Sequence, residues 1–434
     1  MHDHTGRTQT RRDHGDLHDV GRVSGGLPDA PRIPRDDSQS GRHCRLNLPA
    51  NAQFVSVAER LIAFNTVSRN SNLELIAAAK EILASAGATI RFTYDRGRSK
   101  ANLFATIGAE QHGGLVLSGH TDVVPVDGQE WSSDPFTPVI RDGQLYGRGA
   151  ADMKGFLAVA LALAPEFAAL DLRRPIHFAL SFDEEVGCTG VRHLLADLQA
   201  ARMKPALALI GEPTAMRVVS AHKSGSVIET VLRGREGHSS APGLGASAVM
   251  MAGEFVALLA RYQTSLMAEQ DDFFDPPYTT LQANIISGGT AVNVLARDAR
   301  LIWEYRALPH QNPETILQGI KAEAESTILS QYRKGAPEAA ISTSVYAAYP
   351  GLAHDANSPA LRLACVVAGS NRSYSVAYGT EAGLFQQAGI PAVICGPGSI
   401  TQAHKADEFI ALEQLEQCAS FLRRLVNRWN ENGT

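Results

Sequence analysis

The sequence predicts an α/β fold with a mixed, largely parallel sheet that is interrupted by an inserted α+β segment. Up to about residue 221, short apolar runs alternate with helical patterns, as they do in open α/β sheets. From about residue 222 the order becomes β-α-β-β-α-β, which is that of a ferredoxin-like unit. The α/β pattern then returns. We therefore expect one domain over residues 51–221 and 347–434, with a second domain inserted over 222–346.

Apolar periodicity assigns the elements of the first domain. Helical spacing covers residues 55–67 and 72–86, where Gly87 follows as a stop signal, and then 153–169 and 412–429. The expected strands are short apolar runs at 102–107, 115–118, 175–182 and 207–210.

The inserted segment has alternating rather than continuous apolar runs. Strands are expected at 226–232, 278–286, 299–305 and 340–346, and helices at 246–261 and 313–329. The strands 226–232 and 299–305 have no partner in the first domain. We expect them to pair with a second copy of the chain, so that the insert makes a homodimer.

Residues 1–50 differ from the rest of the chain. They contain no Phe, Trp or Tyr but five of the 14 histidines. Such a segment buries too little apolar surface to offset its ordering entropy, so we expect a disordered extension. Metal capture by its histidines is the alternative.

Composition excludes several classes of protein. The 45 acidic and 40 basic side chains give a net charge of −5, which argues against a nucleic-acid-binding surface. No window reaches the roughly 18 apolar residues of a membrane-spanning helix, and no secretory signal is evident. Five scattered cysteines without a C-x-x-C pair fit a reducing compartment. We expect a cytoplasmic protein that binds neither nucleic acid nor membranes.

The segment LVLSGHTDVVP places a histidine and an aspartate directly after a buried strand. His120 and Asp122 are two positions apart, so their side chains share a face if the strand geometry persists. A metal-binding histidine needs an acceptor on its other ring nitrogen, which a carboxylate two residues later can supply. On its own, the pair is more often a structural hydrogen bond.

The segment YGRGAADMKG places a carboxylate at the start of a helix. Gly147 and Gly149 suggest a dinucleotide-binding loop, but Asp152 replaces its third glycine and would repel a pyrophosphate. Asp152 is therefore either a helix N-terminal acid, stabilised by the macrodipole, or a metal ligand held where a glycine-rich turn enters a helix.

Further acids and a histidine follow other expected strands. SFDEEVGCTG contains Asp183, Glu184 and Glu185, LIGEPT ends a strand with Glu212, and His404 lies in the late loop ICGPGSITQAHKADEF. A solvated loop usually explains an acidic run. Alternatively, neighbouring side chains point in different directions, so that one binds metal while another transfers protons. Open α/β sheets place their sites at this edge.

The residue types favour certain metals. Two histidines and several carboxylates, without a thiolate, suit Zn²⁺, Co²⁺ or Mn²⁺. Two such ions about 3.5–4 Å apart can share one bridging carboxylate.

Together the motifs SGHTDVVP, GRGAADMKG, DEEVG, GEPT and AHKADEF closely resemble the M20 family of dinuclear zinc amidohydrolases. The resemblance runs from about residue 54 to the C-terminus. It implies a zinc-exopeptidase-like catalytic domain, two Zn²⁺ ions, a small N-acyl amino acid as substrate and an inserted dimerisation or lid domain. HTDVVP, YGTEAGLFQ and GREGHSSAP are most similar to members that deacetylate N2-acetyl-L-ornithine in arginine biosynthesis. A desuccinylase, an aminoacylase or a glutamate-type carboxypeptidase is the alternative, and a non-catalytic metal-binding scaffold is the alternative of another class.

The resemblance also implies roles for individual residues. The implied metal ligands are His120 and Glu212 for one ion, Glu185 and His404 for the other, and Asp152 for both. Asp122 would orient His120, and Glu184 would be the general base, with Asp183 as a bystander.

The resemblance extends to residues outside the metal centre. His238 would stabilise the oxyanion in the partner subunit's site, unless it is only hydrogen-bonded within its own loop. Asn293 and Arg306 would line the substrate pocket, where Arg306 holds the substrate α-carboxylate or serves as a structural ion-pair partner. Glu381 could face a substrate ammonium or be a helix N-terminal acid.

Overall fold

The computed structural model describes residues 52–108 and 113–432. The extension expected over residues 1–50 lies outside the described residues. Within them, no helix is both long enough and apolar enough to cross a membrane.

The larger sheet has parallel strands at its centre and antiparallel strands toward its edges. In spatial order its strands are β1 (Thr89–Tyr94), β2 (Ala101–Ile107), β6 (Ile176–Ser181), β3 (Leu115–His120), β7 (Leu207–Pro213), β14 (Ala392–Gly396), β8 (Val219–His222) and β13 (Tyr374–Val376). Strands β6, β3, β7 and β14 run parallel, whereas β1 with β2, β2 with β6, and β14 with β8 are antiparallel. The prediction of a mixed, largely parallel sheet is confirmed.

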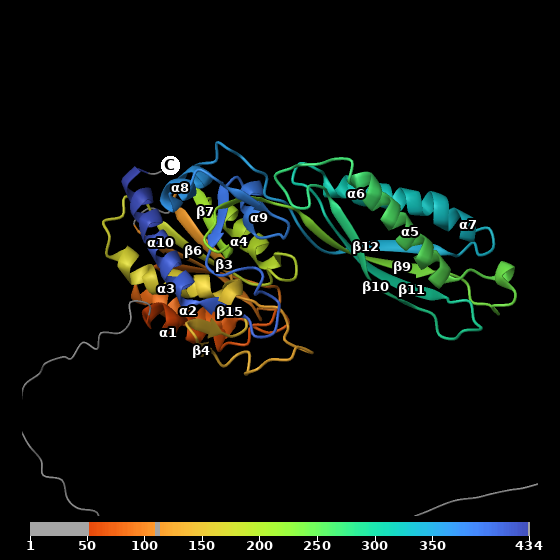
Figure 1. Cartoon of the computed structure of the whole chain (residues 1–434), viewed down its shortest axis with the longest axis horizontal. Coiled ribbons are helices and arrows are strands. Elements are labelled where there is room, and N and C mark those ends of the chain that lie inside the picture. Colours follow the sequence, from red (N-terminus) through yellow and green to blue (C-terminus); the bar gives the residue numbers. More distant parts are fainter. Residues whose placement is uncertain (1–51, 109–112, 433–434) are drawn as a thin grey trace, which may run out of the picture. The chain divides into compact units, whose positions relative to one another are not determined.

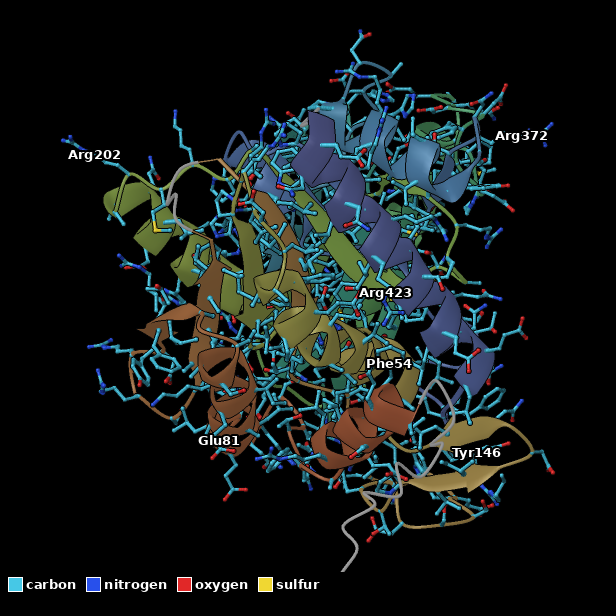
Figure 2. The ribbon with its side chains drawn as sticks, turned by 90° about the vertical axis from the view of Figure 1, so that its left-hand side faces the viewer. Phe54, Glu81, Tyr146, Arg202, Arg372 and Arg423 are labelled. Carbon is cyan, nitrogen blue, oxygen red and sulfur yellow. The ribbon has the colours of Figure 1, made fainter. Side chains whose placement is uncertain are left out.

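Helices cover both faces of this sheet (Figure 1). One face packs against α1 (Ala52–Ile62), α2 (Leu73–Ser85), α3 (Gly155–Ala168), α8 (Pro359–Ala368) and α10 (Leu412–Asn432), and the other against α4 (Thr189–Ala200) and α9 (Ala382–Gln387). Burial on both sides explains why the central strands are continuously apolar. Figure 2 shows the outer side of the first layer, where the Arg423 guanidinium of α10 lies 5.8 Å from the centre of the Phe54 ring of α1.

A small sheet, which the sequence did not reveal, links two distant segments. It consists of β4 (Val139–Arg141), β5 (Gln144–Tyr146) and β15 (Phe409–Ala411), with β5 in the middle. Because Phe409 pairs with Tyr146, the residue before β15 lies beside the turn that follows β5. That turn, Ala150–Lys154, carries Asp152 into α3.

The segment between β8 and α8 forms a separate four-stranded antiparallel sheet. Its strands lie in the order β10 (Thr280–Gly288), β11 (Asp298–Arg306), β9 (Gly225–Arg233) and β12 (Ala340–Tyr349). Helices α5 (Ala248–Leu266) and α6 (Pro313–Glu323) pack on one face, and the short α7 (Ser330–Tyr332) follows (Figure 1). The element order agrees with the predicted β-α-β-β-α-β pattern. The proposed domain boundaries remain a prediction.

The pairing of this sheet corrects one expectation. The strands expected at 226–232 and 299–305 to lack partners form β9 and β11, which are interior and hydrogen-bonded on both sides. They needed no partner from elsewhere because the insert supplies its own. The edges are β10 and β12, and β10 exposes the neighbouring side chains Ile285 and Ile286.

Candidate metal centre

Three adjacent parallel strands deliver polar side chains to one edge of the larger sheet. Strand β3 ends at His120, β7 carries Glu212 near its end, and β6 leads directly into the acidic loop of Glu184 and Glu185. Because β3 lies between β6 and β7, these side chains converge. The sequence places an imidazole and carboxylates where parallel strands end, as the motifs indicated.

The converging residues form two groups that share one aspartate. His120, Asp152 and Glu212 make one group, and Asp152, Glu185 and His404 make the other, with ligand atoms within 4.8 Å of one another in each. The two carboxylate oxygens of Asp152 divide between the groups. Oδ1 lies 3.0 Å from His120 Nε2, whereas Oδ2 lies 3.4 Å from His404 Nε2. His404 Nε2 is also 3.1 Å from Glu185 Oε2. This division suits a carboxylate that bridges two cations.

The site is chemically suited to divalent cations. Glu212 Oε1 is buried and has no hydrogen-bond partner among residues 52–108 and 113–432; the ring nitrogen His120 Nε2 lies 3.9 Å away. Burial raises the pKa of Glu212 well above its usual range, and the neighbouring Asp152 raises it further. A cation between these side chains would relieve both effects. Imidazole and carboxylate donors without a thiolate suit zinc, cobalt or manganese.

Asp122 supports the centre in two ways, one of which differs from the expectation. His120 Nδ1 donates to the backbone carbonyl of Asp122 at 2.9 Å, which turns Nε2 toward Asp152. The Asp122 carboxylate lies farther from that nitrogen, at 3.7 Å. It instead accepts the backbone N–H of Glu184 at 3.0 Å and the Ser68 hydroxyl at 2.7 Å. Asp122 therefore orients the imidazole through its carbonyl and holds the acidic loop through its carboxylate.

The acidic loop separates its three carboxylates. Glu185 joins a ligand group, Asp183 pairs with Lys100, and Glu184 lines a cavity of about 400 Å³ beside the ligand groups. Burial raises the pKa of Glu184 well above its usual range, and the Cys188 thiol donates to its carboxylate at 3.3 Å. Glu184 is thus a carboxylate near the centre that belongs to neither ligand group, which is the position a proton-transfer group needs.

Glu408 is a supporting residue to which the sequence analysis gave no role. Its buried carboxylate pairs with Arg148 at 2.7 Å and accepts the backbone N–H groups of Gly149, Ala151 and Asp152 at 2.9–3.0 Å. The glycine-rich turn is therefore an anion-binding nest that the protein's own carboxylate fills. Its position beside Phe409, in the quoted motif AHKADEF, was the available signal.

The remaining predicted residues divide between the cavity and other places. Arg306 lines the cavity. His238 and Asn293 are both exposed, and neither lines the cavity. They lie close together, because the backbone N–H of Ser239 donates to the Asn293 carbonyl at 3.1 Å. The Ser240 hydroxyl contacts His238 Nδ1 at 2.8 Å, so the histidine is also hydrogen-bonded within its own loop.

Glu381 is the residue at the N-terminus of α9, which is the second of the two places expected for it. Its carboxylate is 1% exposed, does not line the cavity, and accepts the hydroxyls of Ser118 and Ser181 beneath the strand ends. Burial raises the pKa of Glu381 to about 7. This position does not support the expected contact with a substrate ammonium.

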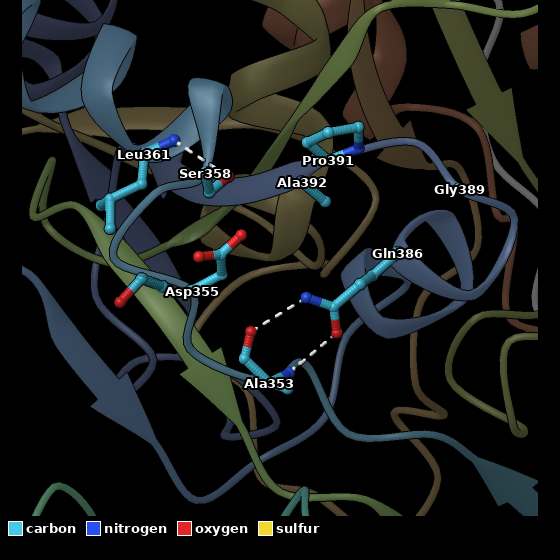
Figure 3. Close-up of a pocket in the computed structure, with 9 residues that line it drawn as sticks. Ala353, Asp355, Ser358, Leu361, Gln386, Gly389, Pro391 and Ala392 are labelled. Carbon is cyan, nitrogen blue, oxygen red and sulfur yellow. Dashed lines mark hydrogen bonds between the residues drawn. The ribbon is translucent and has the colours of Figure 1, made fainter.

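A second cavity, of about 180 Å³, lies beside α8, and its lining residues include none of the candidate metal ligands (Figure 3). There the Gln386 side chain exchanges two hydrogen bonds of 2.9 Å with the backbone of Ala353. These bonds join α9 to the chain before α8, which is a structural role.

Comparison with known proteins identifies the family. Residues 116–428 match the model of peptidase family M20/M25/M40. The chain is 36% identical over 373 residues to an acetylornithine deacetylase of Myxococcus xanthus, covering 84% of this chain and 94% of the relative. It is 32% identical over 385 residues to an acetylornithine deacetylase of Pasteurella multocida, covering 87% and 98%.

Solved structures share the fold at lower identity. An M20 family metallo-carboxypeptidase from Sulfolobus solfataricus aligns with a TM-score of 0.70 at 16% identity, over 86% of this chain and 98% of that one. A tripeptidase from Staphylococcus aureus aligns with a TM-score of 0.68 at 21% identity, over 87% and 98%. From the family match and the extent of the sequence similarity, we conclude that the chain belongs to the M20 peptidase family and is a metal-dependent amidohydrolase.

Proposed function

We propose that this enzyme removes the acetyl group from N2-acetyl-L-ornithine, giving ornithine and acetate. The reaction would be a step of arginine biosynthesis and would take place in the cytoplasm. The observation that carries the proposed chemistry is the pair of ligand groups sharing Asp152, with Glu184, which belongs to neither group, lining the same cavity as Asp152. The choice of substrate is supported by the relatives named acetylornithine deacetylase at 32–36% identity. A desuccinylase, an aminoacylase or a glutamate-type carboxypeptidase is the alternative.

The proposed cofactor is a pair of Zn²⁺ ions, for which Co²⁺ or Mn²⁺ can substitute. The proposed ligands are His120 and Glu212 for one ion, Glu185 and His404 for the other, and Asp152 for both. When bound, the ions would polarise the acyl carbonyl and lower the pKa of water.

The protein side chains carry out the proton transfers and the positioning. Glu184 accepts a proton from the attacking water and delivers it to the departing amine. Arg306 binds the substrate α-carboxylate. Asp122 keeps the Nε2 of His120 turned toward the centre, as the 2.9 Å contact with its carbonyl requires.

We further propose a homodimer in which His238 acts in the partner's site. Within one chain, His238 and Asn293 are exposed and lie outside the cavity. A second copy, bound through the segment 222–346, could bring both to it, where the imidazole would donate to the developing oxyanion. The exposed edge strands β10 and β12 are the available pairing surfaces.

A panel of substrates tests the activity. Purified, zinc-loaded protein is assayed on N2-acetyl-L-ornithine, N-succinyl-diaminopimelate, N-acetylmethionine and a dipeptide, with Glu184→Gln as the control for contaminating hydrolases. We expect the highest kcat/KM on acetylornithine. We also expect chelation to abolish turnover and Zn²⁺ or Co²⁺ to restore it. Full activity in demonstrably metal-free protein would refute the metal mechanism, and a higher kcat/KM on another member of the panel would refute the substrate.

A further inference from the structure

Strand β11 delivers two opposite charges to the wall of the cavity that contains the metal ligands. Along β11, Trp303 and Tyr305 are buried toward α5 and α6, while the alternate residues Glu304 and Arg306 are only partly buried. Residues two apart on a strand share a face, so both charged side chains lie on the open face of the sheet. Both line the cavity together with Asp152 and Glu184.

The contact between these two side chains is loose. Arg306 Nη2 lies 3.4 Å from Glu304 Oε2, and Nε lies 3.4 Å from Oε1. Good charge-assisted contacts are about 2.7–2.9 Å, as in the buried pair of Arg148 and Glu408 at 2.7 Å. Arg306 Nη1 is likewise 3.4 Å from the Tyr349 hydroxyl. Each charge therefore retains hydrogen-bonding capacity for a ligand.

Among the acids that line the cavity, Glu304 is neither a candidate metal ligand nor the proposed general base. The acids that line it are Asp152, Glu184, Glu185, Glu212 and Glu304. The first four are accounted for by the two ligand groups and the proposed general base. Arg306 is the one Lys or Arg among the lining residues. The cavity thus offers a cation and an anion side by side, apart from the catalytic carboxylates.

We propose that Glu304 binds the side-chain ammonium of the substrate while Arg306 binds its α-carboxylate. The cavity would then select N-acyl amino acids with a cationic side chain, and the substrate would replace one loose contact with two charge-assisted ones. This inference rests on the proposed function and deepens it. It gives Glu304 the role that Glu381, buried beneath the strands, cannot fill.

Two substrates of equal shape test the assignment. N-acetyl-L-norleucine has the length of N2-acetyl-L-ornithine but ends in a methyl group instead of an ammonium. Losing a hydrogen bond to a charged group costs about 10- to 100-fold in binding, so Glu304→Gln should lower kcat/KM for acetylornithine by that factor. The same variant should leave kcat/KM for acetylnorleucine within about twofold, because its terminal methyl group makes no hydrogen bond to Glu304 that could be lost. Arg306→Gln should lower both.

The matched control is Glu229→Gln. Glu229 also pairs with an arginine, Arg300, on the same sheet, but it lies outside the cavity, so neither substrate should be affected. An equal loss on both substrates in Glu304→Gln would overturn the inference, because Glu304 would then act only through Arg306. Should Glu304→Gln not fold, the wild-type enzyme can still overturn the inference. A preference for acetylnorleucine would do so and would also refute acetylornithine as the substrate, while leaving an N-acyl hydrolase. Turnover of neither substrate would overturn the proposed hydrolysis of N-acyl amino acids as well.

Discussion

Removing the negative charge of Glu408 should destabilise the protein and loosen the turn that carries Asp152. The Glu408 carboxylate and the Arg148 guanidinium are both 1% exposed and lie 2.7 Å apart. In Glu408→Gln, the Arg148 charge would remain buried without its partner. The single side-chain oxygen would also have to serve backbone N–H groups that two carboxylate oxygens now share.

The size of the effect follows from this burial. Breaking a buried pair by removing one partner typically costs about 3–5 kcal/mol. Arg148 keeps its hydrogen bonds to the Lys405 carbonyl and the Gln129 side chain, so we expect the lower end, about 3 kcal/mol. The chain contains a matched control in the pair of Arg60 and Glu81, which has the same 2.7 Å distance but side chains 48% and 67% exposed. Glu81→Gln should cost at most about 1 kcal/mol.

Two measurements check this prediction. Urea unfolding of both variants gives the free energy of unfolding, and metal analysis after dialysis gives the metal retained per chain. We expect Glu408→Gln to lose both stability and metal, and Glu81→Gln to retain both. If Glu408→Gln unfolds at the wild-type urea concentration and keeps its metal, the nest does not support the centre and the reasoning is wrong.

Three further predictions address the base, pH and the dimer. Glu184→Gln should retain metal but lose at least roughly 10²-fold in turnover, whereas Glu185→Gln should lose metal; metal analysis showing the reverse would exchange their roles. Burial lowers the pKa of His177 to about 4, and its neutral ring accepts the Thr106 hydroxyl at Nδ1 and donates from Nε2 to the Gly113 carbonyl. Because an unfolded histidine titrates near 6.5, the unfolded state binds more protons than the folded state between pH 6.5 and 4. The free energy of unfolding should therefore fall as the pH falls through this window, by up to about 1.4 kcal/mol per pH unit. His177→Gln should flatten this dependence in urea unfolding, and an unchanged slope would contradict the assignment. Mixing His238→Ala with Glu184→Gln should partly restore activity as subunits exchange, since one site in the mixed dimer would then be intact; confirmed mixed dimers without activity would show that His238 does not act across the interface.

Local patterns in the sequence predicted many of the elements and placed several candidate ligands at one edge of the sheet, while the family resemblance supplied their roles. Continuous apolar runs identified β3, β6 and β7 at the centre of the larger sheet, because strands covered on both faces need apolar side chains at every position, whereas β14 was not predicted. The charged and imidazole side chains that follow them, from His120 to Glu212, could be assigned to one edge because parallel strands end together. The ends of the helices and strands were predicted less accurately than their existence. The helix expected over residues 55–67 ends at Ile62, and the end of that range instead contacts the segment after β3, where the Thr66 hydroxyl donates to the Thr121 carbonyl and Val67 pairs with Val123.

The tertiary structure decided which distant residues support the centre and which line the cavity. Glu408 is more than 250 residues from the turn whose N–H groups it accepts, and only the pairing of β15 with β5 brings them together. The places of Glu381 and Glu304 were likewise decided by packing, and the sequence had given Glu304 no role. One carboxylate is buried beneath two strand ends and the other reaches the cavity from a separate sheet. Local spacing specifies a side chain's face on its own element, whereas its neighbours depend on how the elements pack, which no local pattern encodes.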